Sequence, residues 1–215
     1  MKAFIISYNR LTPLKAMCEF LAQTGCEPII IDNASTYQPL LDWLYDCPYE
    51  VHISETNGGH QTLWNNYSHL ITDRYYIVSD HDLDLSEIPH DYIEHLKQGL
   101  EMFPKVIKAG FGLKLLDLPL NAYTREVISW ERKFWETELK NGFYLSDIDT
   151  TFAMYDKTRN FGKLPNNRFF SAVRSKDYVC RHLPWYNTKE TMSEEETYYL
   201  ANTHTYWAGK FIELI

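Results

Sequence analysis

Short apolar runs alternate with helical patterns along residues 1–80, and this alternation constrains the fold more than any other feature of the chain. The runs at residues 3–6, 28–31, 50–53 and 75–78 are too short for helices and are bounded by polar residues, which is typical of buried strands. Between them, residues 11–21, residues 39–45 and a stretch ending at Leu70 have helical spacing. Strand–helix alternation predicts right-handed βαβ crossovers and an α/β fold. Its mostly parallel sheet would be flanked by helices and would carry every polar loop at one edge.

The polar loop after the fourth run contains three acids, Asp80, Asp82 and Asp84. Alternate residues of an extended chain share a face, so Asp80 and Asp82 can converge on one point. Converging carboxylates repel each other unless a cation lies between them. Mg²⁺ or Mn²⁺ is suited to this position, because such ions bind through one or two carboxylates together with phosphate oxygens. Since open α/β sheets bind ligands at the carboxyl ends of their strands, we predict a metal–diphosphate site here. The alternative is an acid-rich turn or a helix cap, with Ser86 opening the next helix.

The other loops at this predicted edge carry residues suited to a nucleotide. Asp32, after the second run, can accept hydrogen bonds from ribose hydroxyls or from a base N–H. Gly58 and Gly59 precede a predicted helix, where backbone amides can approach a phosphate closely. Turn formation alone would also explain the two glycines. As a set on one edge, these loops favour a nucleotide site, and we predict that they are neighbours in space.

Four segments, in this order, resemble the nucleotide-binding half of a GT-A glycosyltransferase: residues 4–10, 30–35, 57–59 and 79–82. The resemblance covers residues 1–90 and implies a UDP-sugar donor held with Mn²⁺ or Mg²⁺ by Asp80 and Asp82. It also implies that Asp32 faces the base. The further donor contacts that it implies are Ser7, Asn9, Arg10, Asn57, Gly58, Gly59, Asp80 and His81.

One departure from the resembled pattern affects the expected contact between the protein and the diphosphate of the donor. Many relatives have Ala-Arg-Asn on the helix after the Asn-Gly-Gly loop, whereas this chain has Leu63, Trp64 and Asn65. Trp64 therefore stands where relatives place an arginine that contacts the donor.

The whole chain also resembles compact glycosyltransferase domains encoded by large algal viruses (chloroviruses), which glycosylate the viral capsid protein.

The second half, residues 91–215, is expected to bind the acceptor and the sugar, because donors meet acceptors there in the resembled fold. Asp147 and Asp149 alternate ahead of an apolar run and therefore share a face. We predict that one of them, preferably Asp149, contacts the acceptor hydroxyl or the donor sugar. A capping or turn role is the alternative.

Two late histidines compete as a further metal ligand. GT-A enzymes often complete the metal shell with a late histidine, and His182 is placed at a strand end within residues 178–186, as that role requires. The rival is His204, with Lys210 as a phosphate-binding lysine, because some relatives have such a pair near the C-terminus. A structural role is the alternative for His182, with Trp185 packing on it.

Other segments of the second half give element predictions without chemistry. Residues 106–115 read as a strand, and residues 130–136 read as a helix with an aromatic face packed on the core. Ser193 is suited to cap a helix, to which no chemistry is assigned. Residues 211–215 read as a strand-like apolar run.

Length and composition set the remaining limits. A chain of 215 residues fits a single α/β domain, and its four cysteines are scattered as reduced core thiols are, which predicts a cytoplasmic location. The net charge of −8 leaves no basic stripe for a nucleic-acid polymer, although a bound cation can still attract a nucleotide. No apolar run is long enough for a membrane span or a signal peptide.

Together these features predict a metal-dependent glycosyltransferase that moves a sugar from a UDP-sugar to a glycan or glycoprotein acceptor. An inverting reaction would need an acidic side chain as general base, and the scarcity of clean candidates slightly favours a retaining reaction. One alternative is a sugar-phosphate nucleotidyltransferase, which normally has a glycine-rich basic loop after the first strand. Residues 7–10 contain no glycine, and this disfavours it. The other alternative is a non-catalytic nucleotide- or sugar-binding module in which Asp80 and Asp82 are only structural.

Overall fold

The computed structural model describes residues 1–148, 151–159 and 172–214. Its strands are β1 Lys2–Ser7, β2 Glu27–Asp32, β3 Glu50–Ile53, β4 Tyr75–Asp80, β5 Leu83–Asp84, β6 Lys108–Leu113, β7 Phe143–Leu145, β8 Ala153–Asp156 and β9 Ala172–His182. Its α-helices are α1 Thr12–Gln23, α2 Gln38–Asp46, α3 Thr62–Asn66, α4 Tyr92–Met102, α5 Ala122–Glu131, α7 Glu194–Ala201 and α8 Tyr206–Leu214. Short 3₁₀ helices lie at Gly59–Gln61, Ser68–Leu70, Arg132–Trp135 and Leu183–Tyr186.

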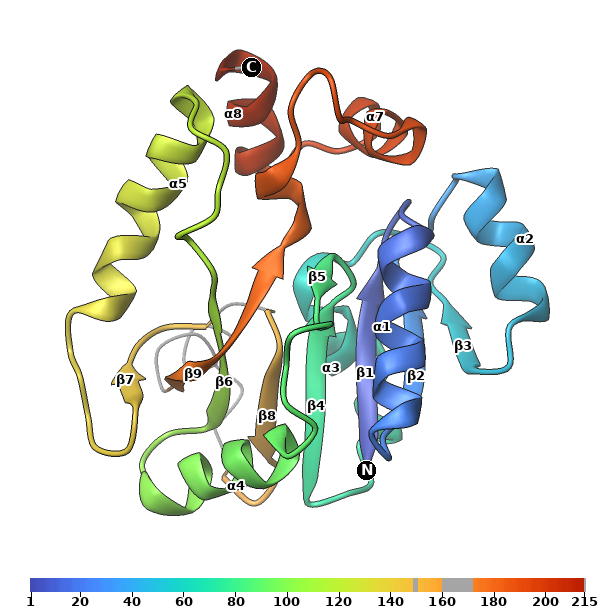
Figure 1. Ribbon diagram of the computed structural model, residues 1–215. Coiled ribbons are helices and arrows are strands. Elements are labelled where there is room, and N and C mark those ends of the chain that lie inside the picture. Colours follow the sequence, from blue (N-terminus) through green and yellow to red (C-terminus); the bar gives the residue numbers. More distant parts are fainter. Residues whose placement is uncertain (149–150, 160–171, 215) are drawn as a thin grey trace.

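The N-terminal half is the parallel α/β unit that the sequence predicts. Strands β3, β2, β1 and β4 lie side by side in this order, and all run parallel (Figure 1). Ser7 pairs with Asp32 and Ile6 pairs with Asp80, so β1, β2 and β4 end at the same edge of the sheet. The predicted fold class is confirmed: a GT-A-like α/β fold with a central sheet flanked by helices and a Rossmann-like N-terminal half.

The C-terminal half extends the sheet and returns to the same edge. Strand β8 enters antiparallel between β4 and β6, and β9 runs parallel to β6. After a register shift between Gly110 and Gly112, β9 also pairs with the short strand β5, where Leu83 lies opposite His182. This pairing carries His182 to the loop that contains Asp82.

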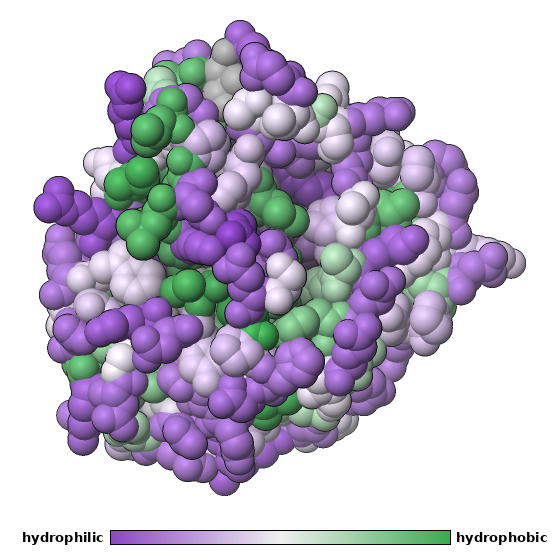
Figure 2. Space-filling view, in the orientation of Figure 1, coloured by the Kyte–Doolittle hydropathy of each residue, from purple (hydrophilic) through white to green (hydrophobic). Residues whose placement is uncertain are grey.

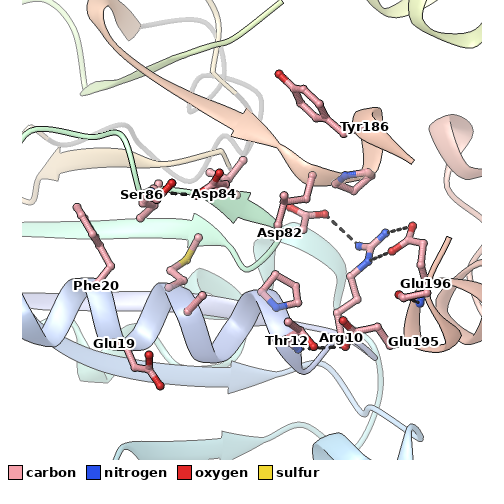
Figure 3. A pocket seen from close by; sticks show the side chains of 18 of the residues that line it. Arg10, Thr12, Glu19, Phe20, Asp82, Asp84, Ser86, Tyr186, Glu195 and Glu196 are labelled. Atoms are coloured by element: carbon pink, nitrogen blue, oxygen red, sulfur yellow. Dashed lines mark hydrogen bonds and ion pairs between the residues drawn. The ribbon is translucent and has the colours of Figure 1, made fainter. Parts of the chain in front are cut away.

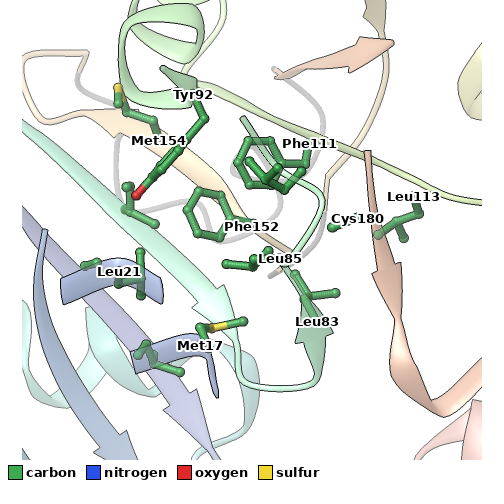
Figure 4. Packing of buried hydrophobic residues seen from close by; sticks show 14 of the residues in the cluster. Met17, Leu21, Leu83, Leu85, Tyr92, Phe111, Leu113, Phe152, Met154 and Cys180 are labelled. Atoms are coloured by element: carbon green, nitrogen blue, oxygen red, sulfur yellow. The ribbon is translucent and has the colours of Figure 1, made fainter. Parts of the chain in front are cut away.

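Two apolar layers lie on opposite faces of the sheet. Alternate strand residues divide between them, so that Ile5 belongs to the larger layer and Phe4 to the smaller one. In the larger layer the rings of Phe111 and Phe152 stack with centroids 4.3 Å apart, and Tyr92 of α4 meets both rings edge-on (Figure 4). Because these aromatic contacts join α4 to β6 and to the start of β8, they fix the C-terminal half of the sheet against its covering helix.

One element prediction in the second half is wrong, and another is confirmed only in part. Residues 211–215 were expected as a strand, but the described part of this run is helical, and Phe211 of α8 packs edge-on against Tyr123 of α5 with ring centroids 5.2 Å apart. Periodicity alone cannot separate a short apolar strand from a buried helical turn, so the neighbouring helix decides the outcome. The helix predicted at residues 130–136 is confirmed in part, because Trp130 and Glu131 end α5 and Arg132–Trp135 continue it as a 3₁₀ helix.

Two smaller predictions are confirmed. Ser193 Oγ accepts a hydrogen bond from the backbone N–H of Glu196 at 3.2 Å and so caps α7. The four cysteines are free thiols, and Cys18, Cys26 and Cys180 are buried. Within the described ranges, no helix combines the length and the apolar character needed to cross a bilayer.

Candidate active site

Hydrogen bonds tie the polar loops at the carboxyl edge to one another. Asn9 has a left-handed backbone (φ 52°), and its Oδ1 accepts a hydrogen bond from the backbone N–H of Thr36 at 2.7 Å. Asn33 links the loop after β2 to the loop after β3, because its Oδ1 accepts from the N–H of Gly58 at 3.2 Å and its Nδ2 donates to the carbonyl of Gly59 at 3.0 Å. The loops after β1, β2 and β3 are therefore neighbours, as predicted.

A cavity of about 350 Å³ lies between these loops and the C-terminal helices, and we call it the edge cavity. Its volume falls within the range of small-molecule sites. The predicted site residues that line it are Arg10, Asn57, Gly59, Asp80, His81, Asp82 and His182. Other polar and aromatic residues complete the wall, among them Tyr8, Asn33, His60, Tyr123, Glu196, Tyr199 and Trp207. In the space-filling view the molecule is hollowed between its C-terminal helices and the parallel half of the sheet, and mostly hydrophilic residues surround the hollow (Figure 2).

Asp82 and His182 face each other at the edge cavity. Asp82 is buried, its Oδ2 accepts a hydrogen bond from Arg10 Nη1 at 3.0 Å, and its Oδ1 lies 3.6 Å from His182 Nε2. Among the described residues, Oδ1 accepts no hydrogen bond. Burial acts to raise the pKa of Asp82, but His182, Arg10 and His81 outweigh it and hold this pKa below its usual value. Asp82 is therefore a carboxylate at neutral pH.

The side-chain atoms of Asp82 and His182 could ligate a cation whose other ligands come from substrate and water. In the described part of the chain, no three His, Cys, Asp or Glu side chains lie close enough to hold an ion by themselves. Asp82 Oδ1 and His182 Nε2 nevertheless face the same space, and Asp80 lines the same cavity. One or two carboxylates with one imidazole fit Mg²⁺ or Mn²⁺ that is otherwise bound by substrate oxygens and water.

His81, between the two acids, has a fixed orientation. Its Nδ1 lies 2.9 Å from the carbonyl oxygen of Ile6, so Nδ1 carries the proton and Nε2 is an acceptor. Burial lowers the pKa of this buried imidazole, which is consequently neutral at physiological pH.

Glu196 of α7 is a site residue that no sequence pattern revealed. Its two oxygens accept hydrogen bonds from Arg10, at 2.6 Å from Nε and at 2.7 Å from Nη2, while Nη1 of the same guanidinium reaches Asp82 (Figure 3). Arg10 is only 4% exposed. Burial acts to lower the Arg10 pKa, but Glu196 and Asp82 raise it by more, so the side chain is a cation. Arg10 and Glu196 lie 186 residues apart, and only the tertiary fold brings them together.

Two residues predicted to contact the sugar donor, Asp32 and Trp64, form hydrogen bonds with other side chains of the chain. Asp32 is fully buried, and its carboxylate accepts hydrogen bonds from the N–H and the hydroxyl of Ser35 at 2.9 and 2.6 Å. Burial raises the pKa of Asp32 in spite of these hydrogen bonds. Trp64 donates from Nε1 to the hydroxyl of Tyr76 at 3.2 Å and packs against the ring of Tyr155. Neither Asp32 nor Trp64 lines the edge cavity, whereas Asn33, next to Asp32, does.

The C-terminal pair lies at the margin of the site. His204 is exposed on the turn between α7 and α8, and only its neighbours Thr203 and Thr205 line the edge cavity. Lys210 Nζ lies 3.0 Å from Glu213 on the same helix. Of the two predicted late histidines, His182 is therefore the one that the structure brings to Asp82.

A second cavity, of about 330 Å³, adjoins the edge cavity, and we call it the aromatic cavity. Its aromatic lining consists of Trp130, Phe134, Trp185 and Trp207. Three residues line both cavities, namely Asp80, His182 and Trp207. Asp147 also lines the aromatic cavity, whereas Asp149 lies outside the described residues.

Comparison with solved structures relates this fold to that of a glycosyltransferase. The chain is similar to a mannosyltransferase from Pyrobaculum calidifontis, solved in complex with GDP-Man and Mn²⁺, with a TM-score of 0.54 and 14% sequence identity. The match covers 88% of this chain and 57% of that one, so this chain spans little more than half the length of the mannosyltransferase. At this identity the likeness is one of fold.

A second solved structure, a CMP:2-keto-3-deoxy-manno-octonic acid synthetase complexed with CTP, matches with 13% identity over 74% of this chain and 75% of that one. Its TM-score of 0.44 is too low to support an argument. No protein-family model matches the chain, and no curated protein matches it in sequence.

Proposed function

We propose that this chain is a metal-dependent glycosyltransferase, which transfers a sugar from a nucleotide-sugar donor, UDP-linked as the sequence resemblance implies, to a glycan or glycoprotein acceptor. One observation carries the proposal: the edge cavity and the aromatic cavity share the wall formed by Asp80, His182 and Trp207. A transferase must bring two substrates to one point, and two adjoining cavities of small-molecule size supply such a point.

The residues of the edge cavity suit the donor. The linked loops after β1, β2 and β3 place polar side chains and the backbone of Gly59 around the space where a nucleotide diphosphate would lie. Asp82, Asp80 and His182 would hold the divalent ion. When bound, this ion would supply Lewis-acid stabilisation of the diphosphate leaving group. Asp82 is already ionised at neutral pH, so no proton has to leave before the ion binds.

The residues of the aromatic cavity suit a sugar acceptor. The faces of Trp130, Phe134 and Trp185 can pack against the apolar faces of sugar rings. Asp147 would contact the acceptor hydroxyl or the donor sugar from this side. The preference for Asp149 and for a retaining reaction stays a prediction, as do the capsid-protein acceptor and the host-cytoplasm location that the viral resemblance implies.

A sugar-phosphate nucleotidyltransferase is the second candidate, and the state of Arg10 disfavours it. Such an enzyme needs a basic side chain in the loop after β1 that can reach a triphosphate. Arg10 is the basic residue of this loop, and it is buried with its guanidinium committed to Glu196 and Asp82.

Calorimetric titration of UDP, GDP and CMP, with and without Mn²⁺, tests the proposal. We expect one nucleotide, UDP, to bind in a metal-dependent manner, and Asp82→Asn to abolish this binding. Asp84→Asn is the matched control, because Asp84 lies two residues on, pairs with Arg181 at 3.5 Å and does not line the edge cavity.

Each other outcome selects a different conclusion. Absence of nucleotide binding in the wild-type protein would overturn the proposal. Metal-dependent binding without turnover of any nucleotide sugar would indicate a binding module. Release of pyrophosphate from a nucleoside triphosphate and a sugar phosphate would indicate a nucleotidyltransferase.

A further inference from the structure

Arg10 connects three parts of the chain that are distant in sequence. It belongs to the loop after β1, its Nη1 donates to Asp82 after β4, and its Nε and Nη2 donate to Glu196 of α7 (Figure 3). The guanidinium also lies over the ring of Tyr199 of α7, with Cζ 3.3 Å from the ring centroid. A guanidinium in a fork with one carboxylate has a fixed orientation. Nη1 therefore donates to Asp82 in one defined direction.

The orientation of Arg10 determines which oxygen of Asp82 is available. With Nε and Nη2 held by Glu196, one N–H reaches Asp82 Oδ2, and Oδ1 is left facing His182. Without Glu196, two N–H groups of the Arg10 guanidinium could pair with both oxygens of Asp82. The guanidinium would then compete with a cation for Asp82 Oδ1. The three buried side chains together carry a net charge of −1, and this unbalanced charge favours a cation beside them.

The position of Glu196 depends on the docking of α7. The neighbouring Glu195 accepts hydrogen bonds from the backbone N–H groups of Leu11 and Thr12, at 2.8 and 3.0 Å, and so caps α1. Leu11, the N-cap residue that precedes α1, has no side chain that can cap this helix locally. The opposite end of α7 is tied to the same loop, because the hydroxyl of Tyr8 donates to the carbonyl of Asn202 at 2.8 Å. Both ends of α7 are thus fastened to the loop that carries Arg10.

We propose that Arg10 and Glu196 are positioning residues for Asp82, so that docking of α7 on the loop after β1 assembles the metal site. This inference rests on the proposed function, since it concerns the ion that Asp82 would bind. Glu196 acts here without touching the ion, by holding the guanidinium away from Asp82 Oδ1.

Binding of Mn²⁺ alone, measured from the electron paramagnetic resonance signal of free Mn²⁺, tests the proposal without any assay of activity. Glu196→Gln is expected to weaken Mn²⁺ binding by about tenfold, within the range of couplings between contacting residues. Glu194→Gln, an exposed neighbour on the same helix, is the control and should bind Mn²⁺ as the wild type does. Circular dichroism and melting temperature establish that each variant is folded.

A double-mutant cycle separates positioning from a merely structural role. A lysine cannot form a fork with a carboxylate, so in the Arg10→Lys background Glu196→Gln should change Mn²⁺ affinity by less than about twofold. Should Glu196→Gln fail to fold, Arg10→Lys alone provides the test, because a single ammonium cannot hold both carboxylates and Mn²⁺ binding should again weaken.

The failure of this inference differs from the failure of the proposed function. A wild-type protein that binds neither Mn²⁺ nor any nucleotide would refute the function itself. A wild-type protein that binds Mn²⁺, with Glu196→Gln and Arg10→Lys both binding it equally well, would refute only the positioning role.

Discussion

The ion pair between Glu131 and Arg174, in the wall of the aromatic cavity, provides a prediction whose size follows from burial. Arg174 Nη1 lies 2.7 Å from Glu131 Oε2, and the side chains of Arg174 and Glu131 are 3% and 4% exposed. Arg174 Nε also donates to the backbone carbonyl of Asp147 at 3.0 Å. Substituting Glu131→Gln removes the charge and leaves a buried guanidinium without its counter-ion.

The expected loss is large because both side chains are almost fully buried. Removing one partner of a buried pair typically lowers the free energy of unfolding by about 3–5 kcal/mol. For a domain of this size that loss corresponds to a fall in melting temperature of roughly 6–20 °C. The exposed pair Lys176–Glu138, 3.4 Å apart with both side chains more than half exposed, is the matched control. Glu138→Gln should cost less than about 1 kcal/mol.

Thermal and urea unfolding of the two variants provide the assay. The double substitution Glu131→Leu with Arg174→Met should be less destabilising than the sum of the two single changes, because it leaves no unpaired buried charge. A loss for Glu131→Gln no larger than that for Glu138→Gln would refute the reasoning from burial.

Three further predictions concern packing, acidity and ligand binding. Gly110→Ala should destabilise the fold by about 1–3 kcal/mol, because the added Cβ would collide with the backbone carbonyl oxygen of Phe152, whereas Gly209→Ala in open space should be neutral or stabilising; equal urea midpoints would contradict this. The pKa of Asp117 is lowered to about 2, because hydrogen bonds from Tyr186 and two basic neighbours outweigh the opposing effect of burial. This carboxylate therefore stabilises the fold above its usual pKa, and the stabilisation is lost as the pH falls from about 4 to about 2. The melting temperature of Asp117→Asn should therefore change less with pH between about 4 and about 2 than that of the wild type. An equal change in both proteins would contradict the stabilising role of the Asp117 carboxylate. Mn²⁺ with UDP should raise the melting temperature and a chelator should reverse the rise; an unchanged melting temperature would argue against binding.

Much of the fold follows from local patterns in the sequence. The strands β1 to β4 and the helix α1 were predicted within a few residues of their observed ends, because buried parallel strands read as short apolar runs between polar loops. Topology then requires that the loops after these strands share an edge, and the hydrogen bonds of Asn33 to Gly58 and Gly59 confirm this. Asp80 and Asp82 were predicted to converge because alternate residues of an extended chain share a face, and both line the edge cavity.

The rest of the site was decided by contacts between distant segments. The direct neighbours of Asp82 are Arg10, which a local loop supplies, and His182, which reaches it only because β9 continues past β6 to pair with β5. The partner of Arg10 is Glu196, from a helix whose acids have the pattern of an ordinary N-terminal turn.

Periodicity records which face of an element is buried, and this information is local. Periodicity does not show which buried or charged side chains contact one another in the folded protein. That choice depends on the free energy of the whole packed arrangement: an arginine is buried where two carboxylates converge on it, and the apolar turn at Phe211 is helical because Tyr123 of α5 covers it. The sheet edge and its acids could therefore be predicted from the sequence. The edge cavity, whose wall includes Glu196 and Tyr199 of α7, forms only in the folded molecule.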